Sequence, residues 1–158
     1  MTMRRAAIVG VTVAVLLGLP VTSAAKPASF AQWWARFSAH VQRDVTRIGN
    51  VCQHRYGHSN LKLGACFVRA ERASLRAERI VFEKQIARIS RDQGKRCKQA
   101  IRQYRSATRR AAVANLAYLD SHPRAGLTQI GRELNGQPYA TLKSKTFSAK
   151  SNAVRVCG

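Results

Sequence analysis

Residues 68–89 read VRAERASLRAERIVFEKQIARI, and this stretch repeats with a period of seven residues. Large apolar side chains recur at one phase of the repeat, at Val68, Leu75, Phe82 and Ile89. Seven residues are close to two helical turns, so these side chains line one edge of a helix. Glu71 and Glu78 flank that edge.

A second apolar stripe lies nearly opposite the first. It consists mostly of small residues: Cys66, Ala70, Ala73, Ala77, Ile80 and Ala87. A helix with two apolar faces is typical of a position between neighbours rather than at a surface. We therefore expect this segment, which begins after Ser59 or Asn60 and ends near Arg91, to be the central helix of an all-α bundle.

The first 25 residues have the three parts of an export signal. Two arginines precede an apolar run at residues 6–19, and Ser23 and Ala25 fit the −3 and −1 positions of a signal-peptidase site. The sequence therefore predicts cleavage before Lys26. An uncleaved membrane anchor is the alternative, but this run is shorter than the roughly 20 residues that a span requires.

The chain carries a strong positive charge, with 28 basic and 7 acidic residues and a net charge of +21. The predicted signal contains arginines but no acids, so residues 26–158 remain strongly cationic as a single domain. Such a domain attracts polyanions: acidic cell-wall polymers, anionic lipid surfaces, polysaccharides or nucleic acid. We expect a secreted or envelope-associated protein.

Four cysteines lie beyond the predicted signal, and an even count in an exported chain indicates two disulfides. Cys66 and Cys97 lie near opposite ends of the central helix, much further apart than the about 7 Å between Cα atoms that a disulfide tolerates. This excludes one of the three possible connectivities. Because Cys52 leaves the first helix at the end of the bundle where Cys66 enters the second, the favoured pairs are Cys52–Cys66 and Cys97–Cys157.

The same region contains the chain's one metal-like cluster, which combines Cys52 and Cys66 with His54 and His58. Two thiolates and two imidazoles can bind zinc. Disulfide formation would use both thiols, so we expect no metal here.

Helical spacing and turn residues place the remaining elements. In chain order they are a helix at 30–48 stopped by Gly49, a loop at 51–60, the central helix, a turn at 92–94, a helix at 95–119, a short helix near 127–134, and a mostly irregular tail at 137–158 with room for a short strand. The alternative to the turn is one helix of about 60 residues, which would be roughly 90 Å long. We expect a disulfide-stabilised bundle of three to four helices around a long helical hairpin.

A ridge of cations follows one edge of the helix at 95–119. Its members are Lys98, Arg102, Arg105 and Arg109, and no acid occurs from residue 93 to 119. These cations either pair with Glu71 and Glu78 across the bundle or face solvent and meet a polyanion. Two acids cannot neutralise four cations, so part of this ridge is the candidate anion-binding site. A solvated arginine face without a ligand is the alternative.

Other functional readings have weaker support. Asp120, Ser121 and His122 are adjacent, but adjacency is not triad geometry, and no phosphate loop or nucleophile elbow occurs. We expect no enzyme activity, no cofactor and no sequence-specific reading of nucleic acid. Trp33 and Trp34 could anchor the first helix at a membrane, but a core position is the preferred interpretation.

A carrier of a small apolar ligand is the second functional hypothesis, because helical bundles can hold haem or lipid between their helices. His40 lies near the apolar edge of the first helix and could ligate haem iron. The preferred prediction is a non-enzymatic, secreted binder of anionic envelope or extracellular polymers.

Overall fold

The computed structural model describes residues 29–158, so the predicted signal peptide and its cleavage site lie outside the described residues. This part of the chain is all-α, as predicted. Its helices are α1 (Phe30–Tyr56), α2 (Asn60–Arg91), α3 (Lys95–Ser121), α4 (Leu127–Asn135) and α5 (Tyr139–Cys157).

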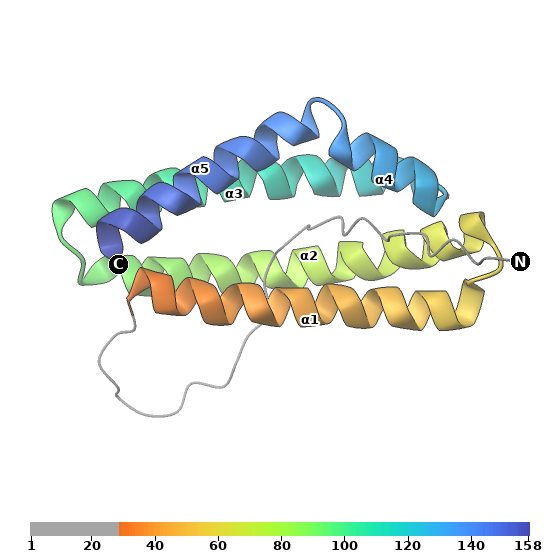
Figure 1. Cartoon of the computed structure of the whole chain (residues 1–158), viewed down its shortest axis with the longest axis horizontal. Helices are drawn as coiled ribbons and strands as arrows, with labels where there is room; N and C mark the ends of the chain where they lie inside the picture. The colour runs from red at the N-terminus through yellow and green to blue at the C-terminus, as the bar shows by residue number, and fades with distance from the viewer. Residues whose placement is uncertain (1–28) are drawn as a thin grey trace, which may run out of the picture.

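The four long helices form an up-and-down bundle (Figure 1). Each packs against two others, in the cyclic order α1, α2, α3, α5, and α5 packs most extensively against α3. The short α4 closes one end of the bundle against α2 and α5. Within the described residues, no helix combines the length and the apolar character that a membrane crossing requires.

The core forms where the seven-residue stripe of α2 meets aromatic residues of α1. Val68, Leu75 and Phe82 are fully buried, and Ile89 packs at the edge of the core. Phe30 and Trp33 are also buried, which confirms that these aromatic residues belong to the core.

The second stripe of α2 was interpreted wrongly. Ala73, Ala77 and Ala87 are exposed, and Ile80 retains 58% of its surface exposed. Small side chains at helical spacing therefore mark a solvent-facing side here, since α1 and α3 both pack toward the bulky stripe.

Both predicted disulfides are present in the structure. Cys52–Cys66 joins the end of α1 to the first turns of α2, and Cys97–Cys157 joins the start of α3 to the end of α5. The two bridges therefore lie at opposite ends of the bundle (Figure 1). They are typical of proteins of an oxidising, extracytoplasmic compartment.

The predicted loop at 51–60 is wrong over most of its length, because α1 continues through Gly49 to Tyr56. A Cβ atom at Gly49 would meet nothing within 4 Å, so no close approach requires glycine there. The connection to α2 is only three residues long, and Cys52 is a buried helical residue. A glycine within a helix costs free energy relative to alanine but does not force an end.

The predicted irregular tail is also wrong, since α5 occupies most of residues 137–158. Only Ala153 of this helix is buried, so its inward face carries too few large apolar residues for a visible amphipathic pattern. Ala100 and Ala107 of α3 are buried, and because their side chains are small, α5 can pack closely against α3.

Candidate anion-binding face of α3

The predicted cationic ridge lies on α3, and its outer members face solvent. Arg102, Arg105 and Arg109 are exposed, and Lys98 is partly exposed. Of these four, only Arg105 forms an ion pair within residues 29–158, and its partner is Glu83 of α2. The structure thus leaves Lys98, Arg102 and Arg109 without an acidic partner in the described part of the chain.

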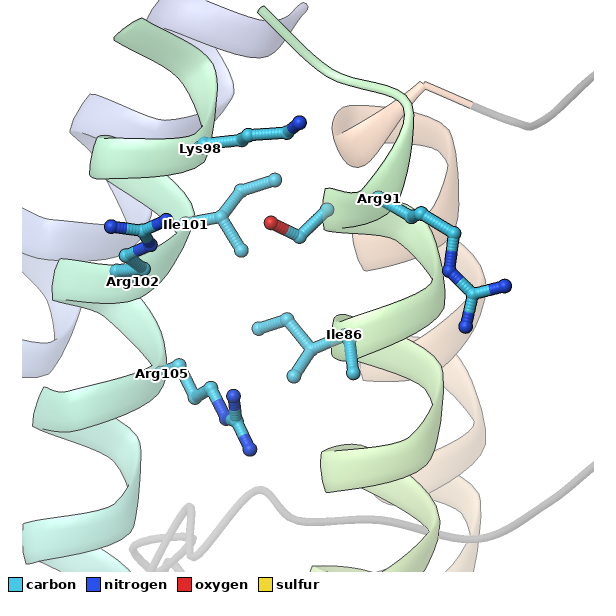
Figure 2. Close-up of a pocket in the computed structure, with 8 residues that line it drawn as sticks. Ile86, Arg91, Lys98, Ile101, Arg102 and Arg105 are labelled. Atoms are coloured by element: carbon cyan, nitrogen blue, oxygen red, sulfur yellow. The ribbon is translucent and has the colours of Figure 1, made fainter. Parts of the chain in front are cut away.

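Three ridge residues line a groove of about 300 Å³ between α2 and α3. In Figure 2, Lys98 and Arg105 reach from α3 toward α2 on either side of Ile101, which faces Ile86. Lys98 lies at one end of the groove and Arg105, which is paired with Glu83, at the other. Ile86 and Ile101 are almost fully buried beneath them.

Two further cations belong to the same groove. Arg91, at the end of α2, lines it but extends its guanidinium group away from the opening, and Arg102 turns toward the other side of α3 (Figure 2). Arg109 lies further along α3 and is not among the lining residues. The sequence ridge therefore divides into a groove portion and a separate exposed arginine.

Of the other acids in the described residues, Asp120 and Asp44 are engaged elsewhere, whereas Asp92, at the end of α2, is exposed and forms no ion pair. Asp120 at the end of α3 pairs with Arg72 and Arg76 of α2, the second at 3.1 Å. Asp44 is nearly buried and lies 3.2 Å from Arg47 of its own helix.

The expected pairing of Glu71 and Glu78 with arginines of the next helix is wrong. Both glutamates point into the core, where the Ser74 hydroxyl donates a hydrogen bond of 2.7 Å to Glu78. One carboxylate oxygen of Glu71, Oε2, has no hydrogen-bond partner. Burial raises the pKa of both carboxyl groups, which disfavours their ionised forms. These acids therefore cannot neutralise the cations of α3.

The residues of the other candidate sites (the zinc cluster, the haem ligand and the membrane anchor) make local contacts within the bundle. The Cys52–Cys66 disulfide uses both thiols of the zinc hypothesis, and residues 29–158 contain no group of His, Cys, Asp and Glu suited to a metal. His40 lies 3.5 Å from Asp44. Trp33 donates a hydrogen bond of 2.9 Å to Gln85, so its indole is part of the core network.

The Asp120–Ser121–His122 sequence does not form a catalytic triad. Oγ of Ser121 lies 2.9 Å from Nδ1 of His122 and 2.9 Å from the carbonyl oxygen of Ala117, and Nδ1 also lies 3.0 Å from the carbonyl oxygen of Tyr118. Because a carbonyl only accepts hydrogen bonds, the imidazole N–H and the serine hydroxyl donate to these groups. On the other side of the ring, Nε2 of His122 lies 4.0 Å from a carboxylate oxygen of Glu133. Asp120 meanwhile pairs with α2. The three side chains stabilise the end of α3.

Sequence reasoning missed three cations of this surface: Arg91, Arg110 and Lys145. Arg91 was treated only as a helix end, and Lys145 lies in the segment that was expected to be irregular. Arg110 follows Arg102 by eight residues, a little over two helical turns, so its place near the ridge could have been recognised. Nothing in the sequence indicates that Lys145 lies beside α3.

Comparisons with protein-family models, curated proteins and solved structures found no match for this chain.

Proposed function

We propose that this protein binds anionic polymers of the cell envelope or extracellular space through the cationic face of α3. The observation that carries the proposal is the shortage of acids beside that face. Lys98, Arg102 and Arg109 have no acidic partner among residues 29–158, although two other arginines share Asp120. A surface charge that the protein does not neutralise is available to a ligand.

The expected binding is electrostatic and does not require a deep pocket. Each contact between a cation and a charged group of the polymer displaces counterions, so affinity should fall steeply as salt concentration rises. Two disulfides are consistent with action outside the cytoplasm. Secretion itself rests on the predicted signal peptide.

The test compares two variants that lose the same charge from different faces. The first replaces Lys98, Arg102 and Arg109 by glutamine, and the matched control replaces Arg36, Arg43 and Arg55 of α1 by glutamine. All three control residues are exposed, and none forms an ion pair in the described part of the chain.

Binding to heparin and to purified cell-wall polymer would be measured at low and at moderate salt with both disulfides intact. The proposal expects tight binding by the unmodified protein, a large loss in the α3 variant and a small loss in the control. Equal losses in the two variants would show that only net charge matters, and absence of binding at low salt would overturn the proposal.

A further inference from the structure

A second cationic groove lies on the opposite side of α3, where α5 packs against it. It has a volume of about 470 Å³ and is lined by Arg102, Gln103, Ser106, Ala107, Arg110, Lys145 and Ala149. α5 contributes Lys145 and Ala149, and the Cys97–Cys157 disulfide holds that helix to α3. The groove exists because residues 139–157 are helical.

The charge of this second groove is also uncompensated. Its lining contains Arg102, Arg110 and Lys145 but no acid, and α5 contains no acid over its whole length. The Arg110 guanidinium donates a hydrogen bond of 2.8 Å to Ser106, which holds it along the surface of α3. None of the three cations forms an ion pair within residues 29–158.

Arg102 connects the two grooves because it lines both. One groove lies between α2 and α3, the other between α3 and α5, and α3 separates them. A helix with its side chains is about 10 Å wide. A single phosphate or carboxylate group is too small to reach both sides, whereas a chain with a charge on every unit can cross α3 and place one charge in each groove.

Six cations line the two grooves, and four of them are arginines: Arg91, Arg102, Arg105 and Arg110, with Lys98 and Lys145. Arg105 is already paired with Glu83. The planar guanidinium fork can bind two oxygens of a phosphate or carboxylate group at once, and arginine is favoured where phosphates are recognised. Neither lining contains an aromatic residue on which a nucleic-acid base could stack. The chemistry therefore fits a phosphate-bearing chain without bases.

We infer that the ligand is a polyol-phosphate polymer that lies across α3 and occupies both grooves, with Arg102 beneath the crossing point. This inference rests on the proposed function and narrows its ligand from any polyanion to a base-free phosphodiester chain. It also assigns a binding role to Arg110 and Lys145, which are not members of the ridge that the proposed function uses.

The test uses poly(glycerol phosphate), glycerol phosphate monomer and single-stranded oligothymidylate as probes at low salt. The second-groove variant is Arg110→Gln/Lys145→Gln, and the matched control is Arg36→Gln/Arg43→Gln on α1. Because linked contacts reinforce one another, we expect the polymer affinity of the second-groove variant to fall about tenfold or more, and that of the control less than about threefold. Monomer should bind weakly to all three proteins.

Three results would overturn the inference. If the second-groove variant matches the control while the Lys98, Arg102 and Arg109 variant loses binding, the second groove is not used, but the proposed function stands. If oligothymidylate binds more tightly than the polyol-phosphate chain, the ligand class is wrong. If no polymer binds to the unmodified protein, the inference and the proposed function both fail. Thermal unfolding of each variant checks that its fold is retained.

Discussion

Glu71 and Glu78 lie two helical turns apart on the core-facing stripe of α2, and each residue keeps only 2% of its surface exposed. Burial raises the pKa of Glu71 to about 8, and the nearby Glu78 carboxyl adds to the rise. Burial also raises the pKa of Glu78 to about 7, against the opposing effect of the hydrogen bond from Ser74. No cation among the described residues forms an ion pair with either glutamate.

The first prediction is that the protein loses stability as pH rises. Between the ordinary glutamate pKa and the raised values, the folded protein holds protons that the unfolded chain releases, so unfolding releases protons. The free energy of unfolding should therefore decrease from about pH 5 to about pH 8 and then level off. Urea unfolding across this range measures it. A stability that rises with pH over the same window would contradict the prediction.

Glu71→Gln should weaken that pH dependence, because the amide keeps the shape of the side chain and removes its charge. At pH 9 the variant should be more stable than the unmodified protein by on the order of 1–3 kcal/mol, since a buried and incompletely hydrogen-bonded carboxylate is removed. The two proteins should differ little at pH 5. Asp92→Asn, at the exposed end of α2, is the control and should leave the pH profile unchanged.

Gly64 should be intolerant of substitution, whereas Gly49 should not. A Cβ atom at Gly64 would lie 2.1 Å from the carbonyl oxygen of Ala125 and 2.6 Å from the amide nitrogen of Leu127. Ala125 lies in the connection between α3 and α4, and Leu127 begins α4. Because both atoms belong to the backbone, Gly64→Ala should cost about 1–3 kcal/mol of stability.

Gly49→Ala provides the matched control within α1. No atom lies within 4 Å of a Cβ at that position, so alanine should stabilise the helix by roughly 0.5–1 kcal/mol. Thermal unfolding of the two variants should therefore shift in opposite directions. Shifts of the same sign would mean that the close approach of α2 to the α3–α4 connection is not structurally important.

The two disulfides should contribute unequally to the free energy of unfolding. Cys52 and Cys66 are separated by 14 residues, and Cys97 and Cys157 by 60. Chain entropy then predicts losses of about 3 and about 4 kcal/mol when each pair is replaced by alanine.

Loss of Cys97–Cys157 should also release α5, which buries only one residue, Ala153. Far-ultraviolet circular dichroism of that variant should show reduced helix content before global unfolding, whereas the Cys52–Cys66 variant should keep its helix content. Full helix content in both would indicate that packing against α3 alone holds α5.

The sequence contained enough information for the bundle but not for its fourth long helix. The repeat through Val68, Leu75 and Phe82 predicted α2 because large side chains at helical spacing leave a visible pattern. The disulfide pairs followed from helix lengths alone. In α5 the inward residues are small, so the contacts that hold it come from the close approach of α3 and from Cys157, and neither leaves a periodic signal.

The candidate site was predicted in part for the same reason. Lys98, Arg102 and Arg105 were recognisable from spacing on one helix, but Lys145 reaches the site only through the packing of α5. Pairing of Glu71 and Glu78 with arginines of the next helix was a hypothesis, because neither glutamate has a basic residue three or four positions away in its own helix. The seven-residue repeat placed both glutamates beside the large apolar side chains of α2, so it did not predict that they would be buried in the core.

The positions of the disulfides have a mechanical consequence. One bridge fastens α1 to α2 and the other fastens α3 to α5, so each half of the molecule is covalently closed. The two halves are joined covalently only by the turn at 92–94, and the seam between α2 and α3 is otherwise held by side-chain packing and by the ion pairs of Glu83 and Asp120. A force that pulls the two halves apart would separate α2 from α3, and the turn at 92–94 would remain their covalent connection. The groove beside Ile101 lies along that seam, so neither disulfide spans it.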